Sequence, residues 1–172
     1  MTETISYEIT GQIGEIEFRN YPPIVLATVQ SPANDSGFNL LFSYITGNNR
    51  TKGQIPMTAP VITSAQIPMT APVVSDGQSM SFVMPGGKEK EEMPEPLDQR
   101  VKITSLPRRE LAVIRFKGYA GQEDVKETTS RLLEGLKKSG ITTQGLPVLM
   151  RYNAPWTPGF LRRNEVGIEI IR

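Results

Sequence analysis

The chain of 172 residues contains no cysteine and no histidine. Without cysteine there is no disulfide, no thiol nucleophile and no thiolate-ligated zinc site. Without histidine there is no Ser-His-Asp or Cys-His catalytic arrangement, and the usual proton shuttle near neutral pH is missing. Any acid–base chemistry must therefore come from Asp, Glu, Lys or Tyr.

An excess of charge of either sign is also missing, because 19 Lys and Arg stand against 18 Asp and Glu. Nucleic acid is therefore not an expected partner, since phosphate binding needs concentrated positive charge. No apolar run approaches the roughly 18 residues that a membrane-spanning helix needs. The first sixteen residues hold three glutamates and no Lys or Arg, unlike a signal peptide. We expect a cytoplasmic protein without membrane contacts.

The length is typical of one domain, for which about 100–200 residues are usual, so a single domain over residues 1–172 is expected. A polar stretch at 86–100, with the charge run Lys88-Glu89-Lys90-Glu91-Glu92, indicates a solvated connector. It separates two halves at about 7–85 and 101–172.

Apolar periodicity predicts a similar order of elements in both halves. The first half has alternating runs typical of strands, then Phe38, Leu41, Phe42 and Ile45 at the spacing of a helix face. The second half has strand-like runs around a longer helical pattern that ends before Gly140. The predicted helices are 37–47 and 121–139, and the extended segments are 13–18, 24–29, 54–63, 66–75, 80–84, 101–106, 111–116, 148–152 and 166–171. This order predicts a pseudo-symmetric α+β domain with helices outside curved antiparallel strands.

An eight-residue motif occurs twice, because Gln54–Val61 and Gln66–Val73 have the same sequence at a spacing of twelve. An even spacing keeps both copies on the same face of an extended chain. Proline cannot donate to a β-ladder, so these segments are expected at an edge, a bulge or a strand end. Met57 and Met69 either pack into a core or line a ligand pocket.

Five groups of motifs, in the same order along the chain, resemble the SOUL haem-binding family over residues 7–171. The motifs are Tyr21-Pro-Pro, Phe42-Ser-Tyr-Ile-Thr-Gly-Asn, both Ile-Pro-Met-Thr-Ala-Pro-Val copies, Met80-Ser-Phe-Val-Met-Pro, and Tyr152-Asn-Ala-Pro with Phe160-Leu-Arg-Arg-Asn-Glu-Val. The resemblance implies a distorted antiparallel β-barrel flanked by two helices and built from two pseudo-symmetric βαββ repeats. It also implies a monomer that binds haem or porphyrin and catalyses no reaction.

The resemblance places the tetrapyrrole against the first helix and the loop before Arg162-Arg163-Asn164-Glu165. Some family members ligate iron through histidine, which this chain lacks, and family pockets present basic side chains from the first helix. Residues 35–47 contain no Lys or Arg, so the nearest cations are Arg50, Lys52, Arg162 and Arg163. We therefore expect haem to be held mainly by apolar contacts. The expected cofactor-binding residues are Phe38, Leu41, Phe42, Ile45, Met57, Trp156, Phe160 and Arg162, with no catalytic residue and no metal-ligating residue.

Each candidate also has a purely structural interpretation. Trp156 either covers the core or offers its ring to a flat ligand, and the apolar residues of the first helix either form core or line a pocket. Tyr44 is either an oxygen ligand of ferric iron or a hydrogen-bonded structural residue. Arg162 and Arg163 either bind propionates or pair with Glu165.

The alternative function is a small-molecule-sensing or hydrolytic domain, similar to the effector-binding domains of bacterial regulators. Such a site needs a buried carboxylate, for which Glu165 and Glu169 are the candidates. An interaction module without a ligand is the third hypothesis.

Overall fold

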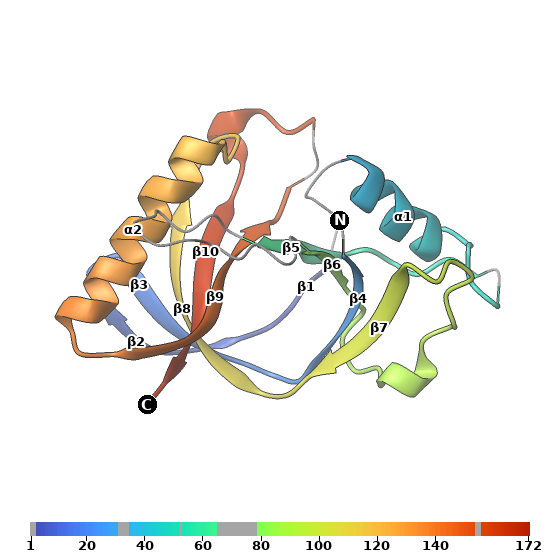
Figure 1. The fold of residues 1–172 in the computed structure, drawn as a ribbon, viewed down its shortest axis with the longest axis horizontal. Helices are drawn as coiled ribbons and strands as arrows, with labels where there is room; N and C mark the ends of the chain where they lie inside the picture. Colours follow the sequence, from blue (N-terminus) through green and yellow to red (C-terminus); the bar gives the residue numbers. More distant parts are fainter. Residues whose placement is uncertain (1–2, 31–34, 52, 65–78, 154–155) are drawn as a thin grey trace. The chain divides into compact units, whose positions relative to one another are not determined.

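The computed structural model describes residues 3–30, 35–51, 53–64, 79–153 and 156–172. The chain forms two compact units with separate cores (Figure 1). Unit 1 consists of Met1–Ile5, Pro23–Thr63 and Ser75–Pro107, and unit 2 of Ser6–Pro22, Ser64–Val74 and Arg108–Arg172. Residues 86–100, the expected connector, lie inside unit 1. Among the described helices, none has the length and apolar character needed to cross a bilayer.

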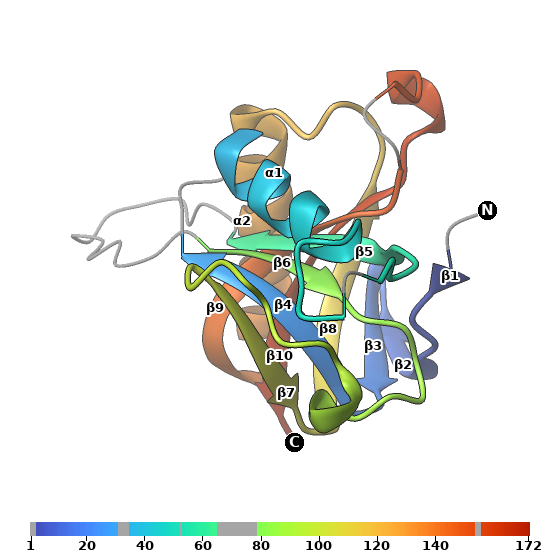
Figure 2. The same cartoon turned by 90° about the vertical axis from the view of Figure 1, so that its right-hand side faces the viewer.

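Unit 1 combines a mainly antiparallel sheet with one α-helix. Its strands pair in the order β5-β6-β4-β7, and β1 pairs in parallel with β5. Helix α1 contacts β4, β6 and β7. Its position among these elements can be followed in Figure 2. The elements are β1 (Glu3–Thr4), β4 (Ile24–Gln30), α1 (Asp35–Ile45), β5 (Thr58–Ser64), β6 (Ser79–Val83), the short 3-10 helix η1 (Lys90–Glu92) and β7 (Val101–Leu106).

The core of unit 1 follows from the helical spacing predicted above. Leu41, Tyr44 and Ile45 are buried on one side of α1 and pack with apolar residues of β4, β6 and β7. The first copy of the repeated motif enters β5, where the register against β6 shifts between Thr58 and Val61. This irregularity agrees with the expected bulge at a strand proline. The second copy, 66–73, lies outside the described residues.

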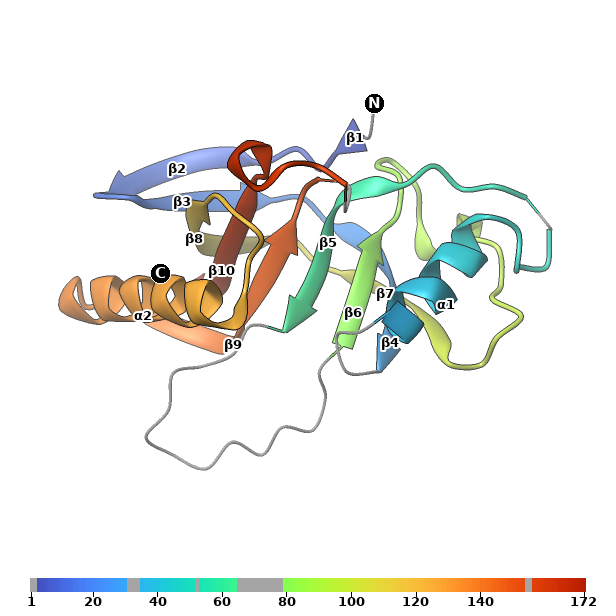
Figure 3. The ribbon, with the colours of Figure 1, turned by 90° about the horizontal axis from the view of Figure 1, so that it is seen from above.

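Unit 2 is an antiparallel sheet with the strand order β2-β3-β8-β10-β9. Helix α2 contacts β8, β9 and β10 and runs alongside the sheet (Figure 3). The elements are β2 (Glu8–Ile13), β3 (Ile16–Tyr21), β8 (Arg109–Phe116), α2 (Gln122–Lys138), β9 (Thr142–Arg151), the short 3-10 helix η2 (Gly159–Leu161) and β10 (Asn164–Ile171).

Helix α2 is specified by its ends and by its buried face. Acidic residues occupy its first turn and lysines its last turn, which complements the helix dipole. Its buried residues include Val125, Leu132 and Leu136, which join the core of unit 2. Gly135 permits close packing, because a Cβ there would lie 2.6 Å from Cδ1 of Ile16 on β3.

The predicted α+β class and both helices are confirmed, but a closed barrel is not. Among the described residues the strands follow a linear order, and the two strands at its ends do not pair with each other, so no barrel is closed. A barrel closes only when its first and last strands pair with each other. The sequence pattern predicts curved strands, but it does not predict that pairing. Both units share the order strand–helix–strand–strand, with neighbours β5-β6-β4 and β9-β10-β8. That these are superposable repeats stays a prediction.

Candidate functional site

The residues expected from the first helix and the repeated motif lie in unit 1. Leu41 and Ile45 are buried in the core and leave no surface for a ligand, whereas Phe38 is half-buried and Phe42 is 46 % exposed. The Phe38 and Phe42 rings stack at 5.9 Å between centroids with an interplanar angle of 13°. Met57 is half-buried against the same core. On this helix, therefore, the aromatic pair supplies the available apolar surface.

Tyr44 has a structural role. Its side chain is buried, and its hydroxyl donates a hydrogen bond to the carbonyl oxygen of Pro94 at 2.7 Å. Burial raises the pKa of Tyr44 to about 12, which opposes formation of the phenolate that iron would need. Of the nearby cations, Arg50 pairs with Glu95 at 3.0 Å, and Lys52 lies outside the described residues.

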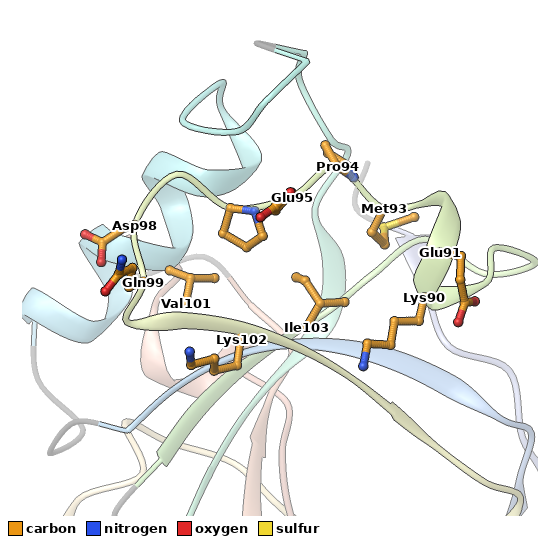
Figure 4. A pocket seen from close by; sticks show the side chains of 11 residues that line it. Lys90, Glu91, Met93, Pro94, Glu95, Asp98, Gln99, Val101, Lys102 and Ile103 are labelled. Atoms are coloured by element: carbon orange, nitrogen blue, oxygen red, sulfur yellow. The ribbon is translucent and has the colours of Figure 1, made fainter.

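A groove of about 390 Å³ in unit 1 lies between the segment around η1 and strand β7 (Figure 4). Its walls include the apolar side chains of Met93, Val101 and Ile103. None of the expected site residues lines it. Charges of both signs surround it, so its chemistry selects neither an anion nor a cation; the charged lining residues are Lys90, Glu91, Glu95, Asp98 and Lys102.

The remaining expected residues lie in unit 2, in the segment between β9 and β10, here called the η2 loop (residues 152–163, of which 154–155 are not described). Its ends are joined by a hydrogen bond from the amide of Tyr152 to the carbonyl of Arg163 at 3.2 Å. Its middle is tied to the turn before α2, because the amide of Gly118 donates to the carbonyl of Gly159 at 3.1 Å. Asn164 also donates to the carbonyl of Gly118, at 2.8 Å. Hydrogen bonds thus hold the loop both where its two ends meet and at Gly159 in its middle.

This held loop carries an unusual amount of exposed apolar surface. Trp156 is 86 % exposed, Phe160 is 73 % exposed and Leu161 is 60 % exposed, while Tyr119 on the adjoining turn is 65 % exposed. We call these four side chains the η2 patch. Aromatic surface gathered on a hydrogen-bonded loop is typical of a binding site rather than of a surface selected only for solubility. Trp156 does not cover the core, so the second of its two interpretations is favoured.

Two arginines border the η2 patch. The guanidinium carbon of Arg162 lies 4.5 Å from the ring centroid of Tyr119, and its Nε donates to the carbonyl of Thr157 at 2.7 Å. Arg151 is half-buried on β9, with Nη2 3.5 Å from the carbonyl oxygen of Ala120. Burial, together with the nearby positive charge of Arg162, lowers the pKa of Arg151. Two positive charges beside the patch favour an anionic ligand.

On another part of unit 2, a buried carboxylate lies among arginines. Both oxygens of Glu165 accept hydrogen bonds from Arg19, at 2.8 Å each, and neither side chain is more than 1 % exposed. Arg163 adds a contact of 3.0 Å and Arg115 one of 3.4 Å. The predicted pairing of Glu165 with an arginine of its own motif is therefore confirmed for Arg163. The principal partner, Arg19, was not predicted from sequence.

The electrostatics of this cluster keep Glu165 ionised. Burial by itself raises the pKa of Glu165, but hydrogen bonds and attraction from Arg19 outweigh it and lower the pKa to about 2. Burial and the charge of Glu165 raise the pKa of neighbouring Tyr152, whose buried hydroxyl makes no hydrogen bond within the described structure. A carboxylate with both oxygens occupied cannot easily accept a proton, so Glu165 is a poor general base.

Among the described residues, no group of three or more acidic side chains forms a metal site. Together with the absence of histidine and cysteine from the sequence, this limits an iron ligand to oxygen, lysine nitrogen or methionine sulfur.

Comparisons with known proteins agree with the motifs. The family model described as SOUL heme-binding protein matches residues 2–169. Heme-binding protein 2 from Homo sapiens is 30 % identical over 164 residues, which cover 91 % of this chain and 78 % of that protein.

Solved structures share the fold at low sequence identity. The C-terminal domain of EcmrR has a TM-score of 0.62 and 11 % identity, covering 96 % of this chain and 98 % of its own. A hydrolase from Listeria innocua has a TM-score of 0.56 and 10 % identity, covering 94 % of each chain. Identities this low show the shared fold alone. The family model and the human relative, by contrast, match across the sequence, and the chain belongs to the SOUL haem-binding protein family.

Proposed function

We propose that this protein binds haem or a related tetrapyrrole without catalysing a reaction, and that the η2 patch provides the contacts. The observation that carries the proposal is the exposure of Trp156 and Phe160 on a hydrogen-bonded loop bordered by Arg151 and Arg162. A flat apolar ligand with carboxylate groups matches both features, since its rings need aromatic contacts and its propionates need cations.

The apolar contacts are sufficient for useful affinity. An aromatic side chain buries about 150–250 Å². Covering half of two such side chains, at about 25 cal/mol per Å², contributes roughly 4–6 kcal/mol before the loss of ligand freedom. A dissociation constant in the micromolar range, equivalent to about −8 kcal/mol, is expected overall, so these two side chains account for only part of the affinity.

The proposal is tested by titrating the purified protein with hemin and following the Soret band. Trp156 is the single tryptophan of the chain, so quenching of its fluorescence in the parent protein reports on the same site. Trp156→Ala and Phe160→Ala should each weaken binding by about 1–3 kcal/mol through lost contact area. Leu146→Ala is the control, because it also removes an exposed apolar side chain of unit 2 but lies outside the patch. Equal affinity of Trp156→Ala and the parent would place the site elsewhere.

The alternative, a sensing or hydrolytic domain, has less support from the described residues. The shared fold with a hydrolase does not extend to catalytic chemistry at this identity. Glu165, its first candidate, is engaged by Arg19 and Arg163. Glu169 is only partly buried, so it lacks the buried position that such a site needs.

A further inference from the structure

Resting on the proposed function, we infer that Tyr119 is the side chain that ligates ferric iron in bound haem, through its phenolate oxygen. Tyrosine is an established type of haem ligand, and this chain has no histidine or cysteine to compete with it. The structure separates Tyr119 from the four other tyrosines by exposure, by hydrogen bonding and by backbone conformation.

The other tyrosine hydroxyls are already occupied or enclosed. Tyr44 donates to a backbone carbonyl in the core of unit 1. In unit 2, Tyr21 is buried and accepts a hydrogen bond from Arg19 at 3.0 Å, and Tyr7 accepts one from Arg163 at 3.1 Å. The hydroxyl of Tyr152 is buried. Tyr119 alone among the five is exposed, and no hydrogen bond to its hydroxyl is formed by the described residues.

The backbone around Tyr119 is held in an unusual conformation. Gly118 has φ 108° and Ala120 has φ 55°, so both neighbours of Tyr119 are left-handed. A non-glycine residue in this region costs on the order of 1 kcal/mol, and it persists because surrounding contacts hold it. Those contacts are visible, since the Ala120 side chain is buried in the core of unit 2 and Gly118 is hydrogen-bonded to Gly159. The turn thereby fixes where the Tyr119 ring leaves the surface.

The ring itself is cradled by the η2 loop. A Cβ on Gly159 would lie 2.6 Å from Cε2 of Tyr119 and 3.0 Å from Cδ2 and Cζ, so the ring occupies the space that a side chain would need. The guanidinium of Arg162 lies over the ring at 4.5 Å. With these contacts in place, the ring is poorly suited to stack on a porphyrin. Its exposed hydroxyl is the group left to interact with a ligand.

Ligation is then a simple exchange at iron(III). Tyr119 would supply its phenolate oxygen to iron(III), its proton would pass to water, and a ligand that hemin carries in solution would be released, with no change in oxidation state. Iron-free protoporphyrin has the same rings and propionates but cannot form this bond, so its affinity does not depend on the Tyr119 hydroxyl.

The test compares hemin with protoporphyrin IX for the parent protein and for Tyr119→Phe, which keeps the ring and its cradle. Loss of the ligand should weaken hemin binding by about tenfold or more and remove the phenolate-to-iron charge-transfer absorption. Protoporphyrin IX affinity should not change. Tyr152→Phe is the matched control and should keep the hemin spectrum of the parent.

The outcomes separate the two claims. If Tyr119→Phe binds hemin with the affinity and spectrum of the parent, Tyr119 is not the ligand, although tetrapyrrole binding stands. If the parent binds protoporphyrin IX as tightly as hemin and shows no charge-transfer band, the inference also fails. If the parent binds neither compound, the proposed function is wrong and the inference falls with it.

Discussion

At the level of single residues, the buried ion pair of Glu165 and Arg19 is the main electrostatic feature of the structure. They join β10 to β3, strands that are far apart in the sequence and separated in the sheet by β8. A buried pair of this kind is not strongly stabilising in comparison with apolar residues of similar shape, but removal of one partner leaves the other charged and unsolvated. The pair therefore favours the arrangement of strands in which Arg19 on β3 and Glu165 on β10 meet.

Replacing Arg19 by Met should lower the free energy of unfolding by about 3 kcal/mol, since Glu165 would lose its one fully buried partner and keep only its contacts with Arg163 and Arg115. Urea unfolding followed by circular dichroism measures the change. Arg115→Met is the matched control, because Arg115 also contacts Glu165 but is half-exposed, so its loss should matter by less than about 1 kcal/mol. Similar losses in both variants would show that burial of Arg19 is not the source of its effect.

The lowered pKa of Glu165 also predicts how stability depends on pH. The folded protein holds this carboxyl at about 2, below its ordinary value of 4.5, so the unfolded chain binds the proton more readily. The contribution is present above about pH 5 and is lost as pH falls toward 2, by on the order of 3 kcal/mol in total. Urea unfolding at several pH values between 7 and 2.5 measures it.

Two variants separate this carboxyl from the others. Glu165→Gln removes the titrating group, so its stability should vary less over the same pH range. Asp98 also has a pKa lowered to about 2, by hydrogen bonds to Arg100, but it lies at the surface, where solvent screens the pair. Asp98→Asn should keep the pH dependence of the parent. A parent whose stability does not change down to pH 3 would contradict the assignment.

At the level of elements, the η2 loop and the turn before α2 form one unit through the contact of Gly159 with Tyr119. Gly159→Ala should displace the Tyr119 ring, because the new Cβ would lie 2.6 Å from a ring carbon and the rigid ring must move as a whole to make room. We expect weaker hemin binding with a change of less than about 1 kcal/mol in unfolding free energy, since the loop is exposed.

Gly121→Ala is the control for this substitution, because a Cβ there meets nothing within 4 Å. It should leave hemin binding unchanged. If Gly159→Ala binds hemin as the parent does, the position of the Tyr119 ring does not matter for the ligand.

The elements that the sequence predicted well are those with strong local patterns. The helices expected at 37–47 and 121–139 are observed at Asp35–Ile45 and Gln122–Lys138. Strand β2 was not predicted, since nearly all its residues are exposed and its alternation is weak. Strand β9 begins earlier than expected, because Gly145, with φ 74°, and Pro147 interrupt the apolar pattern inside it.

The site was predictable to a lesser extent, for a physical reason. The family resemblance predicted Trp156, Phe160 and Arg162 as site residues; Trp156 and Phe160 are exposed and Arg162 is half-buried, and their role in binding stays a prediction. Arg19 could not be identified, because its partner lies 146 residues away and only strand pairing brings them together. No local sequence pattern singles out Tyr119 either, because the proposal that it ligates iron depends on backbone angles and on contacts with Gly159 and Arg162.

Over the whole molecule, each unit is assembled from segments that are not continuous in the chain. Strand β3 belongs to unit 2 and the next strand, β4, to unit 1, while β7 belongs to unit 1 and β8 to unit 2. The pairs β4–β7 and β3–β8 each join the first part of the sequence to the last part. Neither core is complete in one half of the sequence.

A single cut after Lys88, in the exposed stretch before η1, would therefore turn one polypeptide into two interdependent chains. The first fragment would carry β4 without β7 and β3 without β8, and the second fragment would carry β7 and β8 without these two partners. Held together by non-covalent contacts alone, the fragments would behave as a heterodimer. Their stability would then depend on dilution, with each tenfold decrease in concentration disfavouring assembly by about 1.4 kcal/mol.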